Sequence, residues 1–397
     1  MTNWRGFVLG FARSLRQSNA ASDKELPLRR IACRQIALLV LAASWIFAAK
    51  PLEIYFIDVD HGNAVLIVTP TGKTLMFDTG QPGEKYVNRI LAVMQQAGVK
   101  QLDYVVISHY DWDHYGTVPA LAAKIPIVNY VDHGANVRES QTPEQRARDS
   151  GGAPRDPIFQ AYTKAREKGN HIVAKPGDRI PIDGIDLQIV AAGGKLLLEP
   201  LPGAGAPNPA CAVTTPRTDD ATEDGQSVAR LIVYGNFRFA DFGDLTWSKS
   251  YRLICPNNLV GSVDAYVITH HGLSMDVAAN GVWEWGYSSA PPAEVVGLHP
   301  RVAFLLAGED FVGRVSTWDA WERVRKSLGL EDIWQVHYVG EAGPENNAPE
   351  KFIANMSMVD NKAAYIKLSA EADGSFTVVN SRNSYTKRYP AQKAVTK

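Results

Sequence analysis

Apolar residues fall into short runs separated by Gly- and Asp-rich turns, a pattern typical of folds that mix strands and helices. Continuous apolar runs predict buried strands at residues 55–59, 75–78, 104–108, 263–269 and 302–306. Apolar positions three or four residues apart predict helices at residues 86–97, 158–168 and 317–328. The order strand, loop, helix, strand indicates an α/β fold.

The remaining segments predict loops and a closing hairpin. The polar stretch 137–157 is expected on the surface, and the Gly/Pro-rich stretch 193–226 is expected to form a loop or partial lid. Near the end of the chain, residues 364–370 and 375–380 flank the turn signal Ala372-Asp373-Gly374 and predict a β-hairpin.

Four potential metal ligands follow the strand at 104–108 directly, in the run His109-Tyr110-Asp111-Trp112-Asp113-His114. If this run stays extended, His109, Asp111 and Asp113 lie on one side and the two aromatic residues on the other. Gly116-Thr117 then begins a helix at Val118-Pro119, since proline is tolerated in a first helical turn. Imidazole and carboxylate donors held between two rigid elements predict a metal site.

The spacing of these ligands resembles the H-x-H-x-D-H motif of the metallo-β-lactamase superfamily, with Asp111 at the second histidine. The form H-x-D-x-D-H is similar to the metallo-β-lactamase-like domain of ComEC-type competence proteins, and especially to exported single-domain members of that group. The other segments that carry the resemblance occur in the same order: Tyr55-Phe56-Ile57-Asp58-Val59-Asp60-His61-Gly62, Phe77-Asp78-Thr79-Gly80, Phe242-Gly243-Asp244-Leu245 and Thr269-His270-His271-Gly272. The resemblance covers roughly residues 52–389 and implies an αβ/βα sandwich of two mixed sheets with outer helices.

The resemblance also implies a centre of two divalent metal ions, zinc or manganese. The residues it assigns are His109 and Asp111 for one ion, Asp113, His114 and either His270 or His271 for the other, and Asp244 as the bridge. Gly272 follows His271 directly, which favours His271 over His270. A further histidine of the superfamily falls near 222–227, where this chain has none, so Asp224, or otherwise Glu223, would take its place.

The chemistry of such a centre predicts hydrolysis. Two divalent ions about 3.5–4 Å apart stabilise hydroxide at neutral pH, because a bound cation lowers the pKa of water to about 7. Asp111 adds a negative charge and a hard oxygen donor, which admits manganese beside zinc. Asp113 is expected to orient the nucleophile as well as to bind metal. His61, in the loop after the first strand, is either a substrate contact or proton shuttle, or a solvent-facing histidine.

We therefore expect an exported metal-dependent hydrolase whose metal-bound hydroxide attacks an ester-type bond, with a phosphodiester as the first candidate. One alternative is a lactone, lactam or thioester hydrolase of the same fold, since the centre stabilises any developing oxyanion. A second is a non-catalytic metal-binding protein of the cell envelope, which the missing histidine near Asp224 favours. Asp58 and Asp78 are expected to stabilise loops beneath the ligands. His133, after the next strand, either lines the cleft or has a structural role.

The net charge of the chain limits which kinds of substrate it can be expected to bind. The chain has 397 residues and a formal net charge of −1, so no strongly basic field is available to bind a long nucleic acid. A small molecule or short phosphodiester is the expected substrate. The oligomeric state does not follow from the sequence.

The first 50 residues predict a leader, followed by one hydrolase domain over 51–397. Arg29, Arg30 and Arg34 precede an apolar or small run over 36–49, the order of a secretory signal. Cleavage near Ser44 or Ala49 would give a periplasmic or secreted protein, and an uncleaved segment would leave a single membrane anchor. Cys33 would leave with a cleaved signal, and the remaining cysteines, Cys211 and Cys255, would form a disulfide or stay as two free thiols.

Overall fold

The computed structural model describes residues 50–142, 156–219, 221–273, 275–277, 283–285, 289–308, 319–357 and 363–392. All the described residues belong to one compact unit. The expected leader, signal and anchor lie outside the described residues. Among the described helices, none has the length and hydropathy needed to cross a bilayer.

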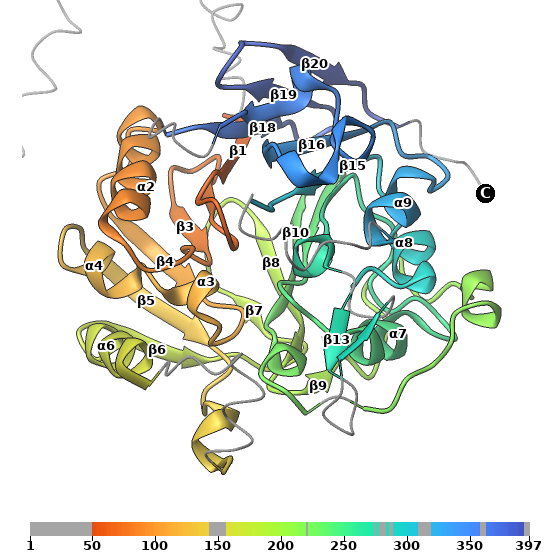
Figure 1. Cartoon of the computed structure of the whole chain (residues 1–397), viewed down its shortest axis with the longest axis horizontal. Coiled ribbons are helices and arrows are strands. Elements are labelled where there is room, and N and C mark those ends of the chain that lie inside the picture. The colour runs from red at the N-terminus through yellow and green to blue at the C-terminus, as the bar shows by residue number, and fades with distance from the viewer. Residues whose placement is uncertain are drawn as a thin grey trace, which may run out of the picture. The chain divides into compact units, whose positions relative to one another are not determined.

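Two large mixed sheets dominate the described part of the chain (Figure 1). The first sheet has the order β20-β19-β18-β1-β2-β3-β4-β5-β6. Its strands are β1 (Leu52–Ile57), β2 (Val65–Val68), β3 (Thr74–Phe77), β4 (Leu102–Val106), β5 (Ile127–Asp132), β6 (Asn170–Val173), β18 (Tyr365–Ala370), β19 (Phe376–Asn380) and β20 (Thr386–Tyr389). Strands β3 and β4 are parallel, with Phe77 opposite Val106, so both end at the same edge.

The second sheet has the order β17-β16-β15-β12-β11-β10-β8-β7, with β9 paired to β8. Its strands are β7 (Arg179–Ile180), β8 (Asp186–Ala192), β9 (Lys195–Leu196), β10 (Ala229–Tyr234), β11 (Phe237–Asp241), β12 (Ala265–Val267), β15 (Val302–Leu305), β16 (Asp332–His337) and β17 (Ile353–Asn355). A separate hairpin joins β13 (Met275–Val277) and β14 (Trp283–Trp285). Strands β11 and β12 are parallel, so their carboxyl ends also share one edge.

Helices cover the outer faces of both sheets (Figure 1). On one side are α2 (Glu84–Gln96), α4 (Val118–Ala122) and α6 (Asp156–Arg166), and on the other are α7 (Trp247–Ile254), α8 (Pro292–Leu298) and α9 (Asp319–Arg325). The short helix α3 (Trp112–Tyr115) follows β4. The 3₁₀ turns are η1 (Val137–Ser140), η2 (Pro209–Ala212), η3 (Asp224–Gln226), η4 (Thr269–Gly272), η6 (Gly340–Ala342), η7 (Pro344–Asn346) and η8 (Glu350–Phe352).

The main hydrophobic core lies between the sheets. Phe56 of β1 stacks on Phe304 of β15 with ring centroids 3.8 Å apart, and it meets Phe239 of β11 edge-on at 5.8 Å. A second core lies between the first sheet and its helices, where the apolar face of α2 buries Ile90 and Met94. The architecture is the expected αβ/βα sandwich: the two sheets pack face to face and helices cover their outer faces.

Most of the predicted elements are confirmed. The helices expected at 86–97 and 158–168 are α2 and α6, and the closing hairpin is the antiparallel pair of β18 and β19. The helix expected at 317–328 is described from Asp319 as α9, and residues 317–318 lie outside the described part. The sequence did not predict several strands, among them β2, β8, β10, β16 and β20, which are short or carry polar residues within the apolar run.

Candidate metal centre

The metal ligands expected from the sequence lie in loops that follow strand ends. His109 follows β4, Asp244 follows β11, and His270 and His271 lie in η4 after β12. Because the parallel strands of each sheet end at one edge, these loops meet between the two sheets. The structure therefore brings together side chains that are far apart in the sequence.

The run from His109 to His114 is not extended throughout, so that prediction was wrong. The backbone is extended at Asp111 and then turns into α3, where the amide of His114 donates to the carbonyl of Asp111 at 2.8 Å. This turn directs Asp113 and His114 to the same buried space. Gly62 packs against the turn so closely that an added Cβ would lie 1.8 Å from the carbonyl oxygen of Asp113. The close contact explains the glycine at this position.

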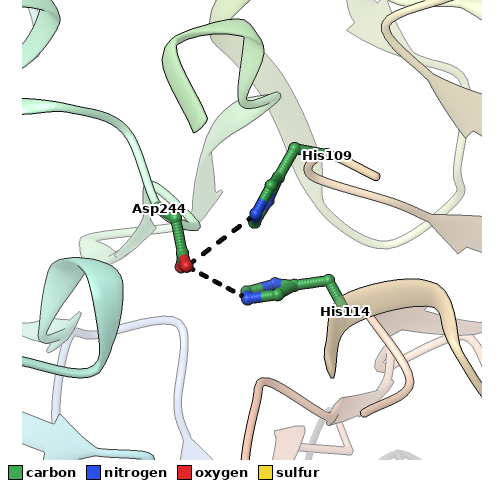
Figure 2. Close-up of side chains that lie close together, drawn as sticks. All are labelled: His109, His114 and Asp244. Carbon is green, nitrogen blue, oxygen red and sulfur yellow. Dashed lines mark ion pairs between the residues drawn. The ribbon is translucent and has the colours of Figure 1, made fainter. Parts of the chain in front are cut away.

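One carboxylate oxygen, Oδ2 of Asp244, is at the middle of the centre (Figure 2). The Nε2 atom of His114 is 3.2 Å away, those of His270 and His271 are both 3.5 Å away, and that of His109 is 3.8 Å away. Figure 2 shows His109 and His114 approaching this oxygen from the same side of the centre. Asp244 is thus placed where a bridging ligand would lie.

The hydrogen bonds of three imidazoles fix which nitrogen faces the centre. Nδ1 of His114 donates to Asp78 at 3.0 Å, and Nδ1 of His271 donates to the carbonyl of Leu306 at 2.7 Å. The Ser108 hydroxyl donates to Asp78 and so accepts from Nδ1 of His109 at 3.0 Å. Each neutral ring consequently presents the lone pair of Nε2 inward.

These inward nitrogen atoms crowd around one carboxylate. The Nε2 atoms of His114 and His271 are only 3.1 Å apart, and both face Asp244. Among the described residues, Nε2 of His109 and Oδ1 of Asp244 are buried and have no hydrogen-bond partner. Tetrahedral ligands with bonds of about 2.0–2.1 Å lie about 3.3 Å from one another. The observed separations match this value, so the donor set fits divalent metal ions.

The candidate ligands divide into two groups around Asp244. In the first half-site, Nε2 of His109 lies 3.5 Å from Asp224 and 4.0 Å from Asp111. In the second half-site, Asp113 lies 3.8 Å from His114 and 3.7 Å from His271. These groups correspond to the two sets of ligands expected from the sequence.

Of the two residues considered for the missing histidine, Asp224 faces His109 and Glu223 does not. Glu223 is fully buried and accepts hydrogen bonds from the Tyr110 amide at 3.0 Å, His133 at 2.7 Å and the Val137 amide at 3.2 Å. Its carboxylate therefore stabilises the surrounding loops. His133 is also buried in this contact, so it has the structural role of the two that the sequence left open.

His61 lies against the second half-site and not in solvent. Its Nε2 is 3.0 Å from Oδ2 of Asp113, and its ring stacks on Trp112 with centroids 5.1 Å apart. Only 11% of its side chain is exposed. A histidine in this position can exchange a proton with groups at the centre, as a proton shuttle requires.

A buried ionic group supports the centre, and the sequence reasoning missed most of it. Oδ2 of Asp78 accepts hydrogen bonds from His114, Ser108, Asn63 and Arg230. Arg230 also donates to Asp241 at 3.0 Å, so it connects the two sheets beneath the ligands. The expectation that Asp78 supports a loop is confirmed, since Oδ1 accepts from the Ser108 amide at 2.7 Å. The signal for Arg230 was a lone charge in the apolar run of β10.

A similar network surrounds Asp58 on the other side of the His61 loop. Asp58 accepts from the amide of Asp60 at 3.0 Å, from Asn355 at 2.6 Å and from His337 at 3.1 Å. Arg89 pairs with Asp60 at 2.7 Å. Asp58 is therefore a loop-stabilising residue, as expected, and His337 has a buried structural role.

The electrostatics of the metal-free centre reflect this crowding. Burial and the neighbouring His114 lower the pKa of His109 to about 4. Burial opposes protonation of His114, yet the carboxylates of Asp244, Asp113 and Asp78 raise its pKa well above the ordinary value. His114, His270 and His271 hold the pKa of Asp244 well below its usual range, although burial acts in the other direction. The centre thus keeps its carboxylates ionised and ready to bind cations.

Comparisons with known proteins find similarity to one superfamily. Residues 57–214 match the model of the metallo-beta-lactamase superfamily. No curated protein sequence matches the chain. Solved structures with a similar fold include YhfI of Bacillus subtilis, a metallo-beta-lactamase fold protein, with 11% identity, a TM-score of 0.39, and coverage of 72% of this chain and 96% of that chain.

Two further structures are similar at comparable levels. CmlA of Streptomyces venezuelae, a diiron beta-hydroxylase, has 12% identity, a TM-score of 0.36, and coverage of 71% of this chain and 47% of that chain. This chain therefore spans about half the length of CmlA. A diphosphatase of the PhnP family has 11% identity, a TM-score of 0.34, and coverage of 78% of this chain and 85% of that chain. Residues 57–214 of this chain are thus similar to the metallo-beta-lactamase superfamily, whose model they match.

Proposed function

We propose that this chain is a metal-dependent hydrolase that cleaves an ester-type bond, with a phosphodiester as its substrate class. The observation that carries the proposal is the set of inward Nε2 lone pairs of His109, His114 and His271 around the Asp244 carboxylate. Such an arrangement of nitrogen and oxygen donors is suited to two divalent cations. When bound, two divalent ions would supply an acidified water at neutral pH.

The residues around the ions have separate roles in this proposal. His109, Asp111 and Asp224 would hold one ion, and Asp113, His114 and His271 the other, with Asp244 shared and His270 supporting the centre. Zinc and manganese both suit this mixture of nitrogen and oxygen donors. His61 is placed to receive a proton and return it to the leaving group, while Asp113 fixes the orientation of its ring.

Charge favours a phosphodiester over a lactone, lactam or thioester. The carboxylates of the centre are offset by Arg138, which pairs with Asp111. Two divalent ions would then leave the centre slightly positive, a condition that attracts an anionic substrate. Hydrolysis of the neutral esters relies on the same centre but gains nothing from this field.

The test compares substrates on protein loaded with zinc or manganese. We expect turnover of bis-p-nitrophenyl phosphate to exceed that of nitrocefin and of a lactone panel. Asp244→Ala should lose both bound metal and turnover, whereas Asp373→Ala, in the exposed turn before β19, should keep both. An active Asp244→Ala variant would overturn the proposal.

The second candidate is a metal-binding protein without turnover. It is favoured by the absence of a histidine at Asp224, which leaves His109 as the imidazole of the first half-site. Metal content by mass spectrometry, measured beside the substrate panel, decides between the two. Bound metal with no turnover of any substrate at saturating manganese would support the non-catalytic protein.

We also propose that the chain is exported. The basic and apolar order of residues 29–49 supports export, and so does the disulfide between Cys211 and Cys255, because such bonds persist in oxidising compartments. The mass of the protein recovered from the periplasm should correspond to a chain that begins near residue 45 or 50. A full-length chain confined to the cytosol would contradict this proposal.

A further inference from the structure

The guanidinium group of Arg138 pairs with the carboxylate of Asp111, the residue at the position of the superfamily's second histidine. Nη2 of Arg138 lies 2.5 Å from Oδ1 of Asp111, and this same oxygen is the one that faces Nε2 of His109 at 4.0 Å. The atom that would bind metal in the first half-site is therefore already paired with a permanent positive charge. Arginine keeps that charge at every physiological pH.

Arg138 is held firmly in this position. Its side chain is only 6% exposed, and Nη1 donates to the carbonyl of Tyr110 at 2.9 Å. Its own turn, η1, is attached to the centre because the Val137 amide donates to Glu223, which also accepts from the Tyr110 amide. The burial leaves little surface for a substrate to contact, so a role as an anion clamp is not supported.

Among the described residues, no arginine or lysine pairs with the carboxylate of the second half-site. Asp113 lies beside three imidazoles, those of His61 at 3.0 Å, His271 at 3.7 Å and His114 at 3.8 Å. A cation that binds at Asp111 therefore meets the guanidinium group of Arg138, which has no counterpart among these contacts of Asp113.

We infer that Arg138 makes the two half-sites unequal: the half-site of Asp113, His114 and His271 binds its ion tightly, and the half-site of His109, Asp111 and Asp224 binds weakly. A charge-assisted hydrogen bond that must be weakened to free Asp111 corresponds to a loss of about tenfold or more in affinity. The resting protein would hold one ion per chain and take a second only at higher metal concentration. This inference rests on the proposed metal centre but does not depend on which bond is cleaved.

The experiment measures stepwise binding of Mn²⁺ to chelator-treated full-length protein, by equilibrium dialysis with mass spectrometry and by electron paramagnetic resonance. The wild-type chain should bind one ion tightly and a second at least about tenfold more weakly. The spectrum should change from isolated Mn²⁺ to a spin-coupled pair during the second step. Arg138→Met should tighten the second step about tenfold and leave the first unchanged.

Two further variants separate charge from folding. Arg301→Met removes another buried arginine, one that pairs with Asp264 and Glu331 in the second sheet, and should leave both steps unchanged. Arg138→Lys keeps the charge and should keep the second step weak. If Arg138→Met does not fold, the wild-type steps and Arg138→Gln provide the same test.

Two results would overturn the inference: equal affinities in the wild-type chain, or a second step that Arg138→Met leaves unchanged or weakens. Failure of the proposed function is distinct from both. A chain with unequal steps and no turnover would retain the inference while refuting hydrolysis, and a chain that binds no metal would refute both.

Discussion

The contact between Asp78 and His114 offers a sharp test of how the centre selects metal. Replacement by asparagine in Asp78→Asn exchanges one accepting oxygen for a donating amide nitrogen. Oδ1 accepts from the Ser108 amide and Oδ2 from His114, Ser108 and Arg230, so either orientation of the new amide places a donor against a donor. The favourable response of His114 is to move its proton to Nε2, where it can no longer bind metal.

The magnitude follows from these contacts. Loss of a carboxylate behind a metal-binding histidine lowers metal affinity about 10- to 100-fold. The same variant should reduce the free energy of unfolding by about 3 kcal/mol, because Arg230 is fully buried and loses one of its two carboxylates. Zinc affinity by equilibrium dialysis and stability by urea denaturation of the metal-free protein measure the two effects separately.

Asp241→Asn is the matched control. Asp241 is also fully buried, and its Oδ2 contacts Arg230 at 3.0 Å and Asn63 at 3.2 Å, but it makes no hydrogen bond to a metal-facing histidine. It should lose similar stability and keep its zinc affinity. Equal zinc affinities for Asp78→Asn and Asp241→Asn would refute the assignment of the His114 proton.

Three other predictions follow from the structure. His61→Asn should lower kcat for the phosphodiester about 100-fold while mass spectrometry finds unchanged metal, since His61 pairs with Asp113 and is not among the residues proposed to bind an ion. A loss of metal in this variant would contradict the role of His61 as a proton shuttle. Burial raises the pKa of Asp132, but hydrogen bonds from His171, Tyr162 and Arg166 outweigh burial and lower that pKa from 3.8 to about 2. The ionised carboxylate therefore contributes about 2 kcal/mol to the free energy of unfolding above pH 4, and this contribution is lost between pH 4 and 2. In an acid titration, Asp132→Asn should not show this loss of stability, and an unchanged loss would exclude Asp132 as its source. The disulfide between Cys211 and Cys255 closes a loop with a sequence separation of 44, so its reduction should lower the free energy of unfolding by about 4 kcal/mol in urea denaturation. A smaller loss in a Cys211→Ser/Cys255→Ser variant would show that the loop is already ordered without the disulfide.

The sequence predicted the sandwich because its signals are local. Apolar runs such as that of β4 identify strands without knowledge of their partners, and Gly98 marks the end of α2. The positions of His109, Asp244 and His271 at strand ends then bring them to one edge of the sheets. Convergence of the ligands therefore required only strand order, which the family resemblance supplied.

The local shape of the ligand run did not follow from the same signals. Alternation of polar and aromatic residues predicted an extended segment, but Trp112–Tyr115 form a helical turn. The turn is stabilised by long-range contacts, with Gly62 packed on Asp113 and Tyr110 and Tyr115 inserted among the aromatic residues of the outer core. Tertiary packing overrode a local pattern that was only six residues long.

The partners of the ligands were least accessible to sequence reasoning. Arg138 reaches Asp111 across 27 positions, and Arg230 reaches Asp78 across 152 positions. No spacing rule connects such pairs, because they depend on how loops from two sheets pack. Yet the partners differ in kind: Asp78 fixes a proton on His114 and leaves its other nitrogen available, whereas Arg138 neutralises the oxygen that Asp111 would offer to metal. A motif shows which atoms can bind an ion, but the charged groups in contact with each atom determine whether that atom is available to the ion. A single arginine can therefore give two half-sites of one motif different affinities for metal.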